Sequence, residues 1–217
     1  MRSTRRSEPI HGWRVWNLGI REDLPTLLPA GSGVGDPWPH RGAAVARCGV
    51  PSLVRGTRRP HEAPDPSCTC GIYARRELDD SPRVAPAWPV PPVVGTVSLW
   101  GRVIEHELGW RGAFAYPSRL TIACTLCLSL EPGPGEPVSV HRFLNQLYPM
   151  CDVHRHGLEL PGGRRTLEID VAPEALRHDL LDAYGVDLLP FEPVAELCRR
   201  PAAPAPPAYV PVIRALP

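Results

Sequence analysis

The chain of 217 residues contains no lysine, only three phenylalanines and five tyrosines, and no long hydrophobic run. A membrane helix needs roughly 20 consecutive apolar residues, and no stretch of the sequence approaches that length. The basic beginning MRSTRR is not followed by an apolar segment, so the sequence does not predict a signal peptide. We therefore expect a cytoplasmic protein without membrane contact, in which cysteine thiols stay reduced.

An excess of charge of either sign is also missing, since 24 basic and 23 acidic residues leave a formal net charge of +1. No global field would draw such a protein to nucleic acid or to an anionic membrane, and only a local basic patch could bind nucleic acid. All of the basic residues are arginines and 29 residues are prolines, which is typical of a GC-rich coding sequence. The arginine doublets therefore need not be phosphate clamps.

Several motifs that mark enzymes are absent from the sequence. It contains no Walker A loop, no G-x-G-x-x-G after a predicted strand, no nucleophile elbow and no H-E-x-x-H. These absences shift the weight from catalysis toward a binding role.

The composition changes along the chain and predicts four segments. Residues 1–92 are rich in proline, glycine and arginine, residues 93–171 are β-rich, residues 172–200 have helical periodicity, and residues 201–217 form a loose Pro/Ala-rich tail. Within the first segment, residues 12–18 alternate as in a strand, residues 29–42 indicate a loop, and residues 85–92 indicate an extended connector.

The most regular pattern predicts a β-hairpin. Residues 93–107 form a long β-branched run, Leu108-Gly109 supplies a two-residue step, and residues 110–116 follow as the second strand. Glycines inside the first strand indicate bulges or a close backbone approach. Residues 118–124 predict a third strand and residues 165–171 a later one.

Two helices are predicted near the C-terminal end. Residues 172–186 have Pro173 in the first turn, Gly185 as a stop signal, and leucines that share one face at helical spacing. Residues 192–200 predict a shorter helix, in which Cys198 is expected to be a buried thiol.

Six of the seven cysteines fall into two groups, and the second group has the clearer spacing. Cys124 and Cys127 form a C-x-x-C pair directly after a predicted strand, and Cys151 and His154 form a later C-x-x-H pair. A two-residue spacer lets both side chains of a pair reach one ion at about 2.0–2.3 Å, so two such pairs predict a tetrahedral zinc site. His156 is an alternative to His154 as the fourth ligand. The intervening EPGPGEP segment is predicted to be a flexible excursion.

The first group is looser in its spacing. Cys48, His61, Cys68 and Cys70 would together form a Cys₃His set, and the glycine after the C-x-C pair suits a tight ligand turn. His40 is the competing histidine. Both groups supply four protein ligands with thiolates, which is typical of a structural zinc site because no position remains for water.

The expected fold is therefore α+β and β-rich, with an antiparallel sheet, two zinc-stapled loop modules and a C-terminal helical segment. Two structural zinc ions are the expected cofactors. Structural zinc contributes folding free energy directly, which suits a chain with so much loop and so few large apolar residues.

Three segments resemble those of a known family: CTCGIYA at 68–74, VVGTVSLWGRVIEHELGWRGAFAYPSRL at 93–120, and the CTLC and CDVH pairs. They are similar in sequence and order to segments of a family of actinobacterial proteins, over roughly residues 12–156. The resemblance implies a common fold and supports both metal sites. It implies no activity and no catalytic residue, because the family has no assigned activity.

A zinc-dependent hydrolase or deaminase is the main alternative. Zinc deaminases carry H-x-E followed by P-C-x-x-C, with the glutamate as proton shuttle and a water on the metal. Here Glu105, His106 and Glu107 precede Cys124 and Cys127, but the histidine and glutamate are adjacent and an alanine replaces the proline. The strand pattern also points the histidine away from both glutamates.

A catalytic pair of Cys151 with His154 or His156 is a second enzymatic alternative. Residues three apart can touch, but catalytic cysteine and histidine usually come from separate elements. The sequence therefore favours the metal site over this pair.

Aromatic residues gather on the second strand of the predicted hairpin. Trp110, Phe114 and Tyr116 share parity, so they lie on one face of the sheet. Core packing is the ordinary explanation, and a pocket for a flat or cationic ligand is the functional alternative. Taken together, the sequence predicts a zinc-stabilised binding or adaptor protein with a protein or nucleic-acid partner. A nucleic-acid-binding regulator is the remaining alternative.

Overall fold

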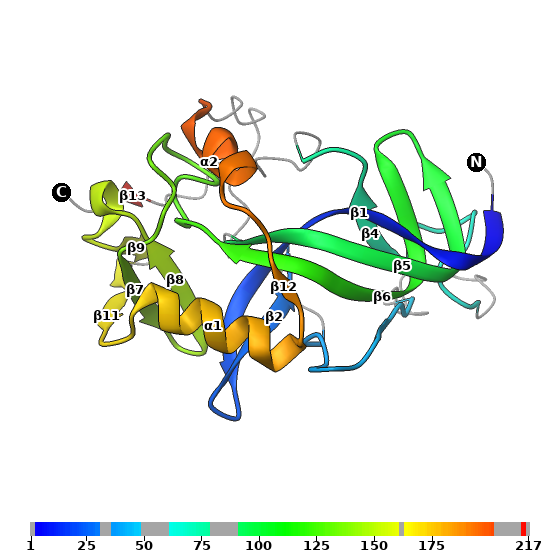
Figure 1. The fold of residues 1–217 in the computed structure, drawn as a ribbon, viewed down its shortest axis with the longest axis horizontal. Coiled ribbons are helices and arrows are strands. Elements are labelled where there is room, and N and C mark those ends of the chain that lie inside the picture. The colour runs from blue at the N-terminus through cyan, green and yellow to red at the C-terminus, as the bar shows by residue number, and fades with distance from the viewer. Residues whose placement is uncertain are drawn as a thin grey trace.

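The computed structural model describes residues 3–30, 36–48, 61–78, 91–160, 163–201 and 214–215. Three long antiparallel strands form the centre of the fold, shorter strands lie beside them, and two helices come late in the chain (Figure 1). Most of the predicted connector and tail, residues 85–90 and 202–213, lies outside the described residues. No helix in the described part of the chain is long and apolar enough to cross a membrane.

The predicted hairpin is confirmed. β5 (Val93–His106) and β6 (Gly109–Ile122) pair in antiparallel fashion along their whole length. Apolar residues at alternate positions of β5, such as Val97 and Leu99, are fully buried, as the pleat of a half-buried strand requires. A Cβ at Gly95 would lie 2.2 Å from the carbonyl oxygen of Arg119, so glycine here permits the close backbone approach that the sequence indicates.

The strand predicted at residues 12–18 is longer than expected. β1 (Ser3–Arg21) pairs with β5 over most of its length and turns through Glu22 and Asp23 into β2 (Leu24–Pro29). Both turn residues have positive φ angles, of 52° and 61°, as tight hairpin turns require. The polar first half of β1 carries no apolar alternation, so its strand conformation comes from pairing with β5.

The prediction of a separate third strand at residues 118–124 is wrong. Residues 118–122 are the end of β6, which continues through Pro117. The register with β5 shifts at this point, since Thr96 pairs with Arg119 while Val97 pairs with Pro117. Ser118 is thus the extra residue of a bulge, and a bulge is where a sheet tolerates proline.

The remaining strands are short. They are β3 (Ala44–Val45), β4 (Ile72–Arg75), β7 (Ser139–Phe143), β8 (Gln146–Met150), β9 (Leu158–Leu160), β10 (Arg164–Arg165), β11 (Leu167–Ile169), β12 (Asp187–Leu188) and β13 (Arg214–Ala215). The pairings β1–β5, β5–β6, β6–β4 and β4–β1 close into a ring. Among the strands that the structure describes, all pairs are antiparallel except β12 with β6.

The strand predicted at residues 165–171 is divided between two sheets. β11 joins the main sheet beside β7, whereas β10 pairs with β9 in a separate sheet of three strands. The third strand of that small sheet is β13, which pairs with β9 on its other side. The predicted loose tail therefore contains one paired strand.

Both predicted helices are present. α1 (Pro173–Tyr184) begins at its proline and ends at Gly185, whose left-handed conformation (φ 61°) is typical of a helix C-cap. The helix packs against β2 (Figure 1), and its Leu176, Leu180 and Tyr184 are buried. The Tyr184 hydroxyl accepts a hydrogen bond from the Leu27 N–H and donates one to the Trp38 carbonyl. The second helix is α2 (Glu192–Arg199).

Two apolar clusters make up the interior. The first surrounds Trp16 between the central strands and α1. The second joins the end of β8 to α2 through Met150 and Val194, and it contains the three cysteines predicted to form the second zinc site. That site therefore lies inside a core instead of on a surface loop.

Candidate metal centres

The structure brings Cys124, Cys127, Cys151 and His154 together in what we call the buried centre. Their four ligand atoms all lie within 4.8 Å of one another. Cys124 follows β6, and its carbonyl accepts a hydrogen bond from the Leu128 N–H, which bends the chain back around Cys127. Cys151 follows β8, and a 3₁₀ turn (η1, Asp152–His154) brings His154 back toward it.

The spacing of the four atoms fits one tetrahedral ion. The Sγ atoms of Cys127 and Cys151 are 3.6 Å apart, close to the edge of about 3.8 Å expected for 2.3 Å zinc–sulfur bonds. The Nδ1 atom of His154 lies 3.5, 3.4 and 3.3 Å from the sulfurs of Cys124, Cys127 and Cys151. Nδ1 is therefore the nitrogen that would bind the metal. His156 is exposed and does not belong to this cluster.

The buried centre is closed to solvent. Its three cysteines are 0% exposed and His154 is 3% exposed, so the protein fills the space around the ligand atoms. Such a site has no open position for water or substrate.

The segment between the two ligand pairs, predicted to be a flexible excursion, packs over the buried centre. A Cβ at Gly133 would lie 2.6 Å from the Cys127 sulfur, so only glycine fits there without displacing the ligand. The Gly133 N–H donates to the carbonyl of Cys198, and the Cys124 N–H donates to the carbonyl of Gly135. Cys198 is fully buried, as the sequence predicts.

Three thiols this close cannot all ionise unless a cation lies among them. Burial raises the pKa of the Cys124 thiol to about 11, and hydrogen bonding with Cys124 is the largest cause of the raised pKa of Cys127. The same hydrogen bonding lowers the pKa of Cys151, which would be the first of the three to ionise. A divalent cation would supply the missing positive charge and release the other two protons.

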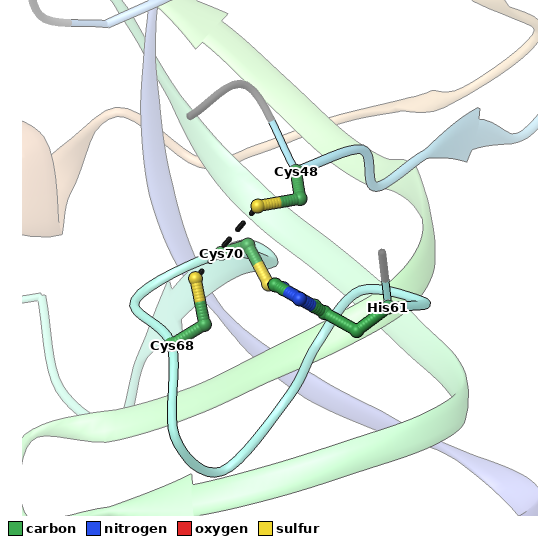
Figure 2. A group of neighbouring side chains, drawn as sticks. All are labelled: Cys48, His61, Cys68 and Cys70. Carbon is green, nitrogen blue, oxygen red and sulfur yellow. Dashed lines mark hydrogen bonds between the residues drawn. The ribbon is translucent and has the colours of Figure 1, made fainter. Parts of the chain in front are cut away.

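The second predicted set, Cys48, His61, Cys68 and Cys70, also comes together, in what we call the groove centre. The four ligand atoms lie within 4.8 Å of one another, and Figure 2 shows the side chains converging from two parts of the chain. The sulfurs of Cys48 and Cys68 are 3.8 Å apart, and the Cys70 sulfur is 3.4 Å from Nε2 of His61. Gly71 has a φ of 128°, as the predicted tight turn requires.

The competing histidine His40 is engaged elsewhere. Its Nε2 atom is 3.1 Å from the carbonyl oxygen of Pro25 and 3.3 Å from the hydroxyl of Thr26. Its ring packs edge-on against Tyr184, with the ring centroids 4.9 Å apart. His61 is therefore the histidine of the groove centre.

The groove centre is more open than the buried centre. Cys68 is buried, but Cys48, His61 and Cys70 are only partly buried. A groove of about 680 Å³ runs beside the centre; it is lined by Cys48 and His61 together with residues of β3 and the β5–β6 hairpin. The two centres thus have the same types of ligand, three cysteines and one histidine each, and differ in solvent access.

Sequence reasoning missed two residues that support the centres. Arg111, 4% exposed, extends from β6 and donates hydrogen bonds to the carbonyls of Cys68 and Cys70, the latter at 2.8 Å. Glu131 places its Oε2 atom 3.4 Å from Nε2 of His154. In the alternation of β6, Arg111 falls on the buried face, and this position could have indicated its burial from the sequence. A buried guanidinium needs hydrogen-bond acceptors around it.

The structure does not assemble the deaminase arrangement. Glu105, His106 and Glu107 lie at the turn of the β5–β6 hairpin, whereas Cys124 follows the opposite end of β6. In Figure 1 this turn lies at the right of the molecule, and β6 runs from it toward the side of β7 and α2. Glu105 instead forms an ion pair with Arg76.

Each aromatic residue of the predicted face has its own contact. The Arg76 guanidinium lies 4.6 Å from the ring centroid of Trp110, and Phe114 stacks on Trp100 at 6.0 Å. The Tyr116 hydroxyl donates to the carbonyl of Tyr184 in α1. The three rings therefore make three different contacts along β6, and Phe114 also lines the groove beside the groove centre. Ligand binding by this face stays a prediction.

We compared the chain with protein-family models, with curated proteins and with solved structures, and none of the three comparisons gave a match.

Proposed function

We propose that this chain is a zinc-stabilised binding or adaptor protein, in which two zinc ions hold the fold and do no chemistry. The observation that carries the proposal is the buried centre, where three sulfurs and one imidazole nitrogen converge without solvent access. Four protein ligands around one closed position are the arrangement of structural zinc.

The ligand chemistry favours zinc over other common metals. Cys₃His donors suit a soft or borderline cation, whereas magnesium and calcium prefer oxygen ligands. The sulfur spacing of 3.6–3.8 Å in the two centres fits tetrahedral zinc–thiolate geometry.

The surroundings of the centres support a structural role over catalysis. Glu131, near the buried centre, faces the imidazole nitrogen that points away from the sulfurs. The acidic side chains considered for proton transfer, Glu105 and Glu107, belong to the far end of the hairpin. The buried centre therefore has neither of these glutamates beside its ligands, as the deaminase arrangement would need.

Metal analysis of the purified chain tests this proposal. We expect two zinc ions per chain, with an X-ray absorption spectrum that shows only sulfur and nitrogen neighbours. An oxygen neighbour from a bound water at either zinc would contradict the structural role and favour the hydrolase or deaminase.

The class of partner can be tested separately. Binding to single- or double-stranded nucleic acid that weakens steeply with salt would identify a nucleic-acid partner. Because the net charge is only +1, we favour a protein partner, and its binding should change little over the same salt range.

A further inference from the structure

The two centres differ in how far solvent reaches their sulfurs. All three sulfurs of the buried centre belong to residues that are 0% exposed. In the groove centre Cys48 and Cys70 are only partly buried, while Cys68 is 5% exposed. The reactivity of a thiolate toward an oxidant depends on access as well as on charge, so the groove centre is the vulnerable one.

The groove leads to one cysteine of that centre in particular. Cys48 and His61 line it, beside the apolar side chains of Val45 and Phe114 and the guanidinium of Arg102. With a volume of about 680 Å³, the groove has ample room for a small uncharged oxidant. An oxidant that enters from this side would meet the Cys48 sulfur first.

The sulfur of Cys68 lies close to that of Cys48. The sulfurs of Cys48 and Cys68 are 3.8 Å apart, and Figure 2 shows them facing each other. A disulfide bond of about 2.05 Å would need a closure of less than 2 Å, which side-chain rotation can supply. The remaining sulfur, of Cys70, faces Nε2 of His61, and its backbone carbonyl is held by Arg111.

We propose that Cys48 and Cys68 form an oxidation-sensitive pair, which hydrogen peroxide converts to a disulfide with release of zinc from the groove centre. The inference rests on the proposed function, because it takes the groove centre to hold zinc. It goes further in making this ion removable, while the ion of the buried centre stays in place.

The reaction balances in two steps. The Cys48 thiolate attacks one oxygen of the peroxide, the O–O bond breaks, and a sulfenic acid forms at Cys48 as hydroxide leaves. The Cys68 thiolate then attacks the Cys48 sulfur, the S–S bond forms, and a second hydroxide leaves. Two thiolates have lost two electrons, which reduce the peroxide, and both hydroxides take up protons to become water. Zinc leaves because Cys70 and His61 alone cannot hold it.

The test uses the full chain loaded with zinc and treated with a limited amount of hydrogen peroxide. A chromophoric chelator follows zinc release, and peptide mass spectrometry identifies the disulfide. We expect one of the two zinc ions to be released roughly tenfold or more faster than the other, together with a Cys48–Cys68 disulfide. A thiol reductant followed by zinc should restore both.

Two variants test whether Cys48 is required for the disulfide and whether a cysteine outside both centres matters. Cys48→Ser should form no disulfide at Cys68, and retention of its buried-centre zinc shows that the variant is folded. Cys198→Ala removes the cysteine outside both centres and should behave like the original chain.

Several results would overturn the inference. Simultaneous loss of both ions, release without a disulfide, or a disulfide between Cys68 and Cys70 would each contradict the assigned pair. A chain that holds only the buried-centre zinc before any oxidant is added would instead refute the proposed function at the groove centre, and the inference with it.

Discussion

The imidazole of His154 lies between the sulfurs of the buried centre and the carboxylate of Glu131. Its Nδ1 atom faces the three sulfurs at 3.3–3.5 Å, and its Nε2 atom is 3.4 Å from Oε2 of Glu131. Nε2 is buried without a hydrogen bond within the described residues, so this nearby carboxylate is the group that can stabilise a proton there and leave the Nδ1 lone pair for the metal. We therefore predict that Glu131 orients this ligand without touching the ion.

Replacing Glu131 tests this relationship. We expect Glu131→Ala to weaken zinc binding at the buried centre by about tenfold, the lower end of the usual effect, because the carboxylate is partly solvated. Glu136→Ala, at an exposed position of the same segment, is the matched control and should leave affinity unchanged. Chelator competition gives both values. Equal affinity in the two variants would show that Glu131 has no orienting role.

Removal of a ligand from the buried centre should unfold the protein. Structural zinc provides about 10–16 kcal/mol of folding free energy in small zinc domains, which is comparable to the whole stability of a typical domain. We therefore expect Cys124→Ser to lose its cooperative thermal transition, and a strong chelator to do the same to the original chain. Cys198→Ala should keep the transition and both ions. A folded Cys124→Ser protein with normal stability would refute the structural role.

Arg111 should be needed by the groove centre. Its guanidinium is buried and donates to the carbonyls of Cys68 and Cys70, so Arg111→Ala leaves two acceptors without a donor, at about 1–3 kcal/mol each. We expect this variant to lose groove-centre zinc and keep the other ion, as elemental analysis would show. Arg102→Ala, from the neighbouring strand, should keep both ions. Full zinc content in Arg111→Ala would contradict the bracing role.

The stability of the fold should fall in mild acid because of His141. This histidine is 3% exposed, its Nε2 lies 2.9 Å from the Arg155 carbonyl oxygen, and burial lowers its pKa. The unfolded chain therefore binds a proton at a higher pH than the folded chain does. The stabilising contribution is complete above pH about 6.5 and is lost as the pH falls below that value.

Thermal melts with excess zinc between pH 7.5 and pH 5 check this prediction. The melting temperature should fall less steeply in His141→Gln than in the original chain, although the variant is less stable at neutral pH. Identical slopes would assign the acid sensitivity to other groups.

The spacing of cysteines predicted more of the site than any other signal. Two x₂ pairs define a tetrahedral site by local geometry, so Cys124, Cys127 and Cys151 could be grouped from the sequence. The choice of His154 over His156 needed the 3₁₀ turn, which buries one ring and exposes the other. Glu131 was not predicted, and strand parity could have indicated only that Arg111 is buried, because the groups that each side chain meets depend on long-range packing.

In the fold, too, local sequence patterns predicted some elements, whereas long-range packing determines the others. Apolar alternation predicted β5 and the first half of β6, since each strand buries one face. The polar half of β1 and the continuation of β6 through Pro117 escaped prediction, because their conformation is set by their neighbours in the sheet. Strands from the first two predicted segments pair in one sheet, and the order of the strands could not be inferred from periodicity.

The pairing of β1 with β5 also has a consequence for synthesis on the ribosome. Trp16 pairs with Val93, so β1 can pair with β5 only after roughly 80 more residues have been translated. Until then, β1 presents an unpaired edge in the nascent chain, together with the first cysteines to emerge. During this interval β2, which follows β1 directly, is the strand available to pair with it.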